Sequence, residues 1–131
     1  MSVEPWLRGT LTEVGAVQRA VLHAFEMAAE DLELWCGPLS DEELNARPFE
    51  VAPVAFHLRH IPRSLDRLLT YAEGGQLSGE QIVVMKAELD GGATREGLFA
   101  ELREGLEAAR RRVVAFSPSA MEDARGIVGA R

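Results

Sequence analysis

Three long stretches of this chain repeat apolar residues at steps of three and four, the spacing of one face of an α-helix. They cover residues 14–35, 53–73 and 94–116. A Gly-Pro pair, a Gly-Gly pair and a Ser-Pro pair follow the three stretches and end them. Helices of similar length that each carry one apolar face bury those faces by packing lengthwise. The sequence therefore predicts an all-α bundle.

Shorter helices are predicted between the long ones. The spacing of a capping box occurs three times, in Thr10 with Glu13, Ser40 with Glu43, and Ser78 with Gln81. The first box predicts the start of the first long helix, the second a single helical turn, and the third a short crossover helix over residues 82–89. Thr94 is expected to cap the third long helix. Pro62 lies inside the second long helix and predicts a kink there.

Three long helices leave one side of a bundle thinly covered. Three alternatives follow: the helix over residues 82–89 covers that side, a second chain does, or a fourth helix is missing from the sequence.

Composition limits the class of protein. With 131 residues, of which 47% are apolar, the chain forms one domain over residues 1–131. A net charge of −7 argues against a nucleic-acid partner, because phosphate binding needs clustered Lys and Arg. No stretch approaches the roughly 18 apolar residues of a membrane span, and no signal peptide begins the chain. The single cysteine predicts a reducing, cytoplasmic location.

The second long helix carries the candidate site. A polar stripe runs beside its apolar stripe, consisting of His57, His60, Ser64, Arg67 and Tyr71. Imidazole is a common neutral metal ligand and a common general base, so this stripe resembles the polar side of a pocket. A half-exposed polar edge with hydrogen-bonded histidines is the alternative, because two histidines are fewer than the three protein ligands of a typical catalytic metal.

Other distinctive side chains receive structural interpretations. His23 falls nearly opposite the apolar stripe of the first helix, which predicts a solvated position. Cys36 has no partner for a disulfide and is expected to pack as a small apolar residue. Trp6 and Trp35 lie near opposite ends of the first helix, so we expect separate core or interface positions.

Residues 56–74, which open with Phe-His-Leu-Arg-His-Ile, resemble the second helix of the DinB-like proteins, and residues 37–48 are similar to the connection before it. The resemblance implies an up-down-down-up four-helix bundle that holds a divalent metal, often nickel or zinc, on three histidines. His60 matches the ligand of the second helix. The other two ligands come from a His-x-x-x-His pair on the fourth helix, and no histidine follows Phe116. The fourth helix is therefore expected to be absent or truncated, with His57 as a substitute ligand or as a hydrogen-bond donor to a ligand.

Two functions follow from the resemblance and its gap. Active members of the family resemble metal-dependent hydrolases or thiol transferases, which implies a small-molecule substrate that Arg67 and Tyr71 would orient. The alternative is a non-catalytic helical interaction module that acts as a homodimer and buries its thinly covered side between subunits. DNA binding is disfavoured by the acidic charge.

Overall fold

The computed structural model describes residues 3–123, and in that part of the chain all regular structure is helical. The three long helices are α1 (Ala16–Cys36), α3 (Val54–Ala72) and α5 (Arg95–Ala115). Two short α-helices, α2 (Asp41–Asn45) and α4 (Gly79–Lys86), and three 3-10 turns complete the fold, the turns being η1 (Pro5–Leu7), η2 (Pro48–Glu50) and η3 (Pro118–Glu122). The prediction of an all-α bundle is confirmed.

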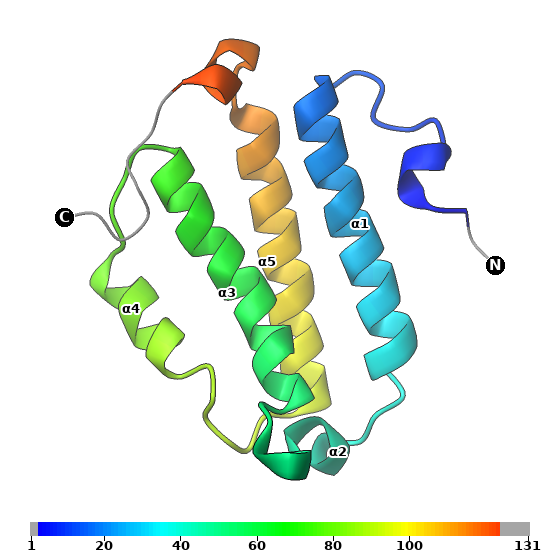
Figure 1. The fold of residues 1–131 in the computed structure, drawn as a ribbon, viewed down its shortest axis with the longest axis vertical. Helices are drawn as coiled ribbons and strands as arrows, with labels where there is room; N and C mark the ends of the chain where they lie inside the picture. The colour runs from blue at the N-terminus through cyan, green and yellow to red at the C-terminus, as the bar shows by residue number, and fades with distance from the viewer. Residues whose placement is uncertain (1–2, 124–131) are drawn as a thin grey trace.

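α5 is the central helix of the bundle. It packs against α3 and α1, whereas α1 and α3 make at most a marginal contact with each other. α3 and α5 run in the same direction and α1 runs against them (Figure 1). α4 lies along the side of α3 that faces away from α1, so the crossover helix does not cover the gap between α1 and α3.

The core lies where α5 meets its two neighbours. Leu22 of α1, Leu58 of α3 and Leu102 of α5 are almost completely buried, and Leu44 of α2 is buried at the lower end of the bundle. Complete burial of one such leucine contributes about 2 kcal/mol. These side chains make the three-helix packing the stable arrangement of the amphipathic stripes.

α3 and α5 approach each other closely at a proline and a glycine. α3 continues as one helix through Pro62, which is buried. A Cβ atom added to Gly105 of α5 would overlap the Cβ of Pro62. The glycine therefore allows the two backbones to come close without a side chain between them.

The helix starts follow the predicted caps in three of four cases. Both reciprocal capping-box hydrogen bonds form at Ser40 and at Ser78, and Thr94 caps α5 by accepting from the amide of Gly97. The prediction of a capping box at Thr10 is wrong. α1 begins at Ala16, its cap is Gly15, and no side chain takes part.

The segment before α1 is instead a turn that passes through a left-handed residue. Leu11 has a φ of 58°, a conformation in which the chain cannot continue as a helix. Arg19 fastens this turn by donating to the carbonyl oxygens of Leu11 and Val14, at 3.0 Å each.

Both tryptophans are exposed. Trp6 is 54% exposed and Trp35 is 73% exposed, so neither occupies a core position, and the interface alternative stays a prediction for both. Cys36 is partly buried and packs against the core, as predicted, and burial raises the pKa of its thiol.

Within residues 3–123, no helix combines the length and the apolar character that crossing a membrane requires.

Candidate functional site

A buried carboxylate joins the crossover segment to α3. Glu88, which follows α4, is buried, and its Oε2 lies 2.9 Å from Nδ1 of His60. Its Oε1 accepts a hydrogen bond of 2.8 Å from Nη1 of Arg67. His60 and Arg67 are seven residues apart, about two helical turns, so they share one face of α3. One carboxylate can therefore bind both side chains.

The pKa of Glu88 reflects two opposing effects. Burial raises the pKa, because it disfavours the charged carboxylate. The hydrogen bonds from His60 and Arg67, together with the positive charge of Arg67, outweigh burial and hold the pKa of Glu88 below its ordinary value. Glu88 is thus ionised at neutral pH and needs the guanidinium of Arg67 to remain stable in its buried position.

Two more arginines of α3 hold the same part of the chain. Arg59 donates to the carbonyl oxygen of Asp90, and Arg63 donates to the carbonyl oxygen of Val84 at 2.7 Å. Arg63 also forms a two-pronged ion pair with Glu101 of α5, at 2.7 and 3.0 Å. The polar side of α3 therefore fastens α4 and the segment after it to the bundle.

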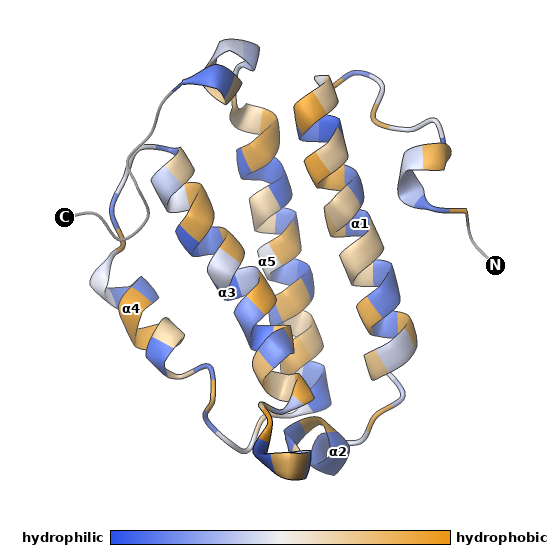
Figure 2. Ribbon diagram, viewed as in Figure 1, coloured by the Kyte–Doolittle hydropathy of each residue, from blue (hydrophilic) through white to orange (hydrophobic). Residues whose placement is uncertain are grey.

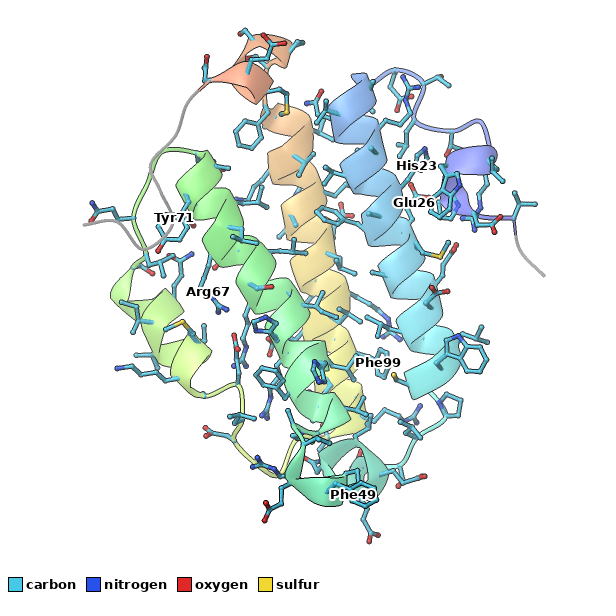
Figure 3. The ribbon with its side chains drawn as sticks, viewed as in Figure 1. His23, Glu26, Phe49, Arg67, Tyr71 and Phe99 are labelled. Atoms are coloured by element: carbon cyan, nitrogen blue, oxygen red, sulfur yellow. The ribbon has the colours of Figure 1, made fainter. Side chains whose placement is uncertain are left out.

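The remaining residues of the predicted stripe do not join this cluster. The ring of His57 is exposed and packs edge-on against Phe56, while the ring of His60 stacks on Phe56 with the planes 20° apart. Ser64 donates to the carbonyl oxygen of Ile61 within its own helix. Tyr71 lies on the same side of α3 as Arg67, towards α4 (Figure 3). The structure thus brings together two of the five predicted residues, through a glutamate that the sequence did not single out.

The described residues do not fit a metal centre. In the range 3–123, no three His, Cys, Asp or Glu side chains are close enough together to hold one ion. Nδ1 of His60 is taken by Glu88, and both oxygens of Glu88 are taken by His60 and Arg67. Metal binding by His60 and His57 stays a prediction that needs ligands from outside this range.

His23 is buried, and the prediction of a solvated position is wrong. The residue is 4% exposed, on a side of α1 that η1 covers, and Figure 3 shows it with Glu26 on the side towards η1. Its Nδ1 lies 3.4 Å from a carboxylate oxygen of Glu26 but has no partner with hydrogen-bond geometry. Arg8 fastens η1 nearby through a two-pronged ion pair with Glu30, at 2.7 and 2.8 Å. The arm before α1 thus gives this helix a second buried side.

The gap between α1 and α3 presents an apolar surface, which we call the α1/α3 face. Val17 is 59% exposed and Leu68 is 52% exposed, and the other members are partly buried. By helical spacing, the face consists of Val17, Val21, Ala28 and Leu32 on α1, and of Ile61, Leu65, Leu68 and Ala72 on α3; Leu32, Ile61 and Leu65 also pack against the core. Figure 2 shows orange and tan along the front of α1. No member of the face is charged.

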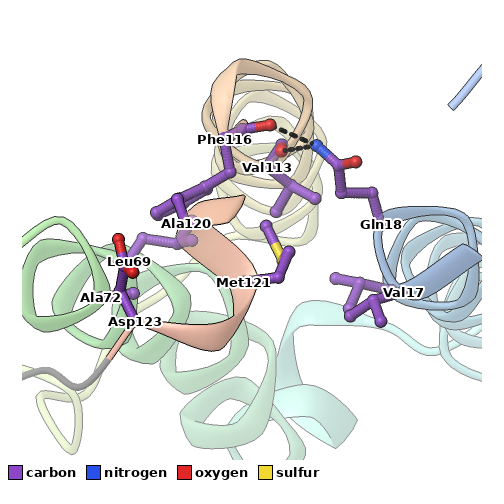
Figure 4. A pocket seen from close by; sticks show the side chains of 10 residues that line it. Val17, Gln18, Leu69, Ala72, Val113, Phe116, Ala120, Met121 and Asp123 are labelled. Atoms are coloured by element: carbon purple, nitrogen blue, oxygen red, sulfur yellow. Dashed lines mark hydrogen bonds between the residues drawn. The ribbon is translucent and has the colours of Figure 1, made fainter. Parts of the chain in front are cut away.

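One end of the α1/α3 face is hollow. A cavity of about 260 Å³ lies between the first turns of α1 and the last turns of α3 and α5, and η3 forms part of its wall (Figure 4). The cavity is mainly apolar. The carbonyl groups at the end of α5 are satisfied by Gln18, whose side-chain nitrogen donates to the carbonyl oxygens of Val113 and Phe116 at 3.0 and 2.7 Å.

The comparisons with known proteins bear on the whole bundle. Neither the curated proteins nor the solved structures contain a significant match to this chain. Residues 24–127, which run from the third turn of α1 past the end of η3, match the DinB superfamily. Together with the all-helical fold, this match shows that the chain belongs to the DinB superfamily.

Proposed function

We propose that this member of the DinB superfamily is a helical interaction module that pairs with a second copy of itself through the α1/α3 face. The observation that supports the proposal is the face itself, because a large apolar surface open to water marks an interaction site on most proteins. The proposal favours the homodimer over the metalloenzyme, since the polar side of α3 is occupied by contacts to Glu88, Glu101 and backbone carbonyls.

The size of the face suits a dimer. α1 and α3 have 21 and 19 residues, so each is roughly 30 Å long, and two helices side by side are roughly 20 Å across. The face therefore covers roughly 600 Å² on each copy. Two copies would bury about 1,200 Å², which is at the lower end of stable specific interfaces.

The chemistry of the face favours a second copy over an unrelated partner. A twofold contact places the same patch on both sides, so it needs a patch that does not repel itself. The α1/α3 face meets that condition because none of its side chains is charged. Trp35 extends the stripe, since it lies 18 residues, or about five helical turns, after Val17. An exposed tryptophan at the edge of an apolar patch is a frequent anchor of protein interfaces.

Light scattering tests the dimer. We expect the wild-type chain to have twice the mass of one chain at micromolar concentrations. Leu68→Lys should give a monomer, because it places a charge within the buried face. Leu89→Lys is the matched control, since Leu89 is 51% exposed and lies after α4, away from the face; this variant should remain a dimer. A wild-type chain that is monomeric up to millimolar concentration would contradict the proposal.

A divalent metal at His60, nickel or zinc, is the second candidate, and one contact favours it. In histidines that bind metals, the ring nitrogen that does not bind the metal commonly forms a hydrogen bond to a carboxylate, which fixes the orientation of the ring. Nδ1 of His60 forms such a hydrogen bond with Glu88. The side chain of His60 is 43% exposed. Any hydrolase or thiol-transferase activity, with Arg67 and Tyr71 at the substrate, depends on ligands that complete such a site.

Elemental analysis of an untagged protein tests the metal. If His60 binds a metal, we expect a stoichiometric amount of nickel or zinc in the wild-type chain and the loss of that metal in His60→Ala. His23→Ala is the control, because His23 is buried on another helix. Wild-type protein that stays free of metal after incubation with either ion would rule out this candidate.

A further inference from the structure

The cavity at the η3 end of the α1/α3 face has an apolar wall built by four elements. Its lining includes Val17 and Val21 of α1, Leu69 and Ala72 of α3, Phe116 at the end of α5, and Met121 of η3. Figure 4 shows Met121 and Val17 near each other beneath Gln18. Because Val17 is largely exposed, the cavity is open to solvent on that side, and a molecule could enter without unfolding of the bundle.

The polar groups at the wall of the cavity do not favour a polar ligand. The side-chain nitrogen of Gln18, which is buried, already donates to the carbonyl oxygens of Val113 and Phe116. The remaining polar side chain is that of Asp123 at the exposed rim. An anionic ligand would have to leave water for this mainly apolar wall, which costs free energy. The wall therefore selects a neutral, mainly apolar molecule.

The volume sets the size of that molecule. An apolar cavity of about 150 Å³ holds benzene, which has six non-hydrogen atoms, and remains dry when empty. At the same packing, 260 Å³ accommodates about ten non-hydrogen atoms, which is the size of two fused rings. The flexible thioether of Met121 and the ring of Phe116 can adapt to a flat aromatic ligand.

We propose that this cavity is a binding site for a neutral bicyclic aromatic molecule of about ten non-hydrogen atoms. The site is distinct from the His60 cluster. It shares Val17, Val21 and Ala72 with the α1/α3 face, so a second copy on that face would cover the open side of the cavity. A ligand of this size with mainly apolar contacts is expected to bind with a Kd on the order of 0.1–1 mM.

Titration with indole, followed by NMR of the protein methyl groups, tests the proposal. We expect saturable shifts at Ala72, Ala120 and Met121, which line the cavity. Indole-3-acetate, which adds a carboxylate, should bind at least tenfold more weakly. Ala72→Leu fills the cavity from α3 and should weaken indole binding at least tenfold. Ala120→Leu fills it from η3, should have the same effect, and serves as the test if Ala72→Leu does not fold.

Two controls make the result specific. Ala115→Leu makes the same change at an exposed position of α5 outside the lining and should bind indole like the wild type. Leu68→Lys, which removes the proposed dimer contact and lies outside the lining, should bind indole at least as tightly as the wild type. The absence of saturable binding, equal binding of the anion, or binding that survives both filling substitutions would overturn the proposal.

Discussion

Replacing Gly105 with alanine lowers the free energy of unfolding by about 3 kcal/mol, at the upper end of the usual cost of overpacking. The new Cβ overlaps the Cβ of Pro62 on α3, and neither atom belongs to a flexible side chain that could turn away. The helices must move apart, which weakens contacts along the best-packed pair of the bundle. The loss exceeds the gain of about 1 kcal/mol that alanine brings to a helix interior.

Urea unfolding followed by circular dichroism measures this loss. Gly79→Ala is the matched control, because a Cβ at Gly79 meets no atom within 4 Å. That variant should be as stable as the wild type or slightly more stable. If Gly105→Ala were also neutral, the close approach of α3 and α5 would not be a feature of the folded protein.

Replacing Arg67 with methionine costs about 3–4 kcal/mol, because it leaves the buried charge of Glu88 without its strongest counter-charge. Arg67 and Glu88 are both largely buried, at 12% and 6% side-chain exposure. Methionine keeps the apolar stem of the arginine, so the effect reports mainly the lost ion pair. Arg103→Met is the control. Arg103 pairs with Glu33 on the open surface, and the loss of an exposed pair should leave stability almost unchanged.

The same ion pair makes stability depend on pH. Because the pKa of Glu88 is lowered in the folded state, the contribution of Glu88 is fully present above the ordinary carboxyl pKa, about 4.3. It is lost as the pH falls through the lowered pKa. Unfolding curves recorded from pH 7 to pH 3 should therefore show a steeper loss of stability for the wild type than for Glu88→Gln. Parallel losses in the two proteins would contradict the role assigned to this carboxylate.

The long helices could be predicted from the sequence because their signals are local. Apolar spacing located α1, α3 and α5, and three of the four caps formed as expected. The fourth failed at Thr10, where Leu11 takes a left-handed conformation and the helix starts six residues after Thr10, at Ala16.

The candidate site was only partly predictable, because its partners come from distant parts of the chain. The polar stripe on α3 was visible from spacing, but Glu88 follows α4 and carries no local pattern that indicates burial. His23 was misplaced for a related reason. A helical stripe shows which side of α1 faces α5, but it does not show that the N-terminal arm, with Pro5 fully buried, covers another side.

The fold excludes one of the three alternatives for the thinly covered side of the bundle, namely that the short crossover helix covers it. α4 packs on the far side of α3, so the short crossover helix leaves the α1/α3 face open among the described residues. A second copy covers that face in the function proposed here.

NMR with a soluble paramagnetic agent tests this claim most directly, because the agent attenuates signals of methyl groups that water can reach. We expect the methyl signals of Ala28 and Leu68 to be protected at high protein concentration and to become attenuated on dilution. In Leu68→Lys, the methyl signal of Ala28 should be attenuated at every concentration. The methyl signals of Leu89, outside the face, should be attenuated throughout. Equal attenuation of Leu68 and Leu89 at every concentration would show that the α1/α3 face stays open to water and would contradict the proposed pairing.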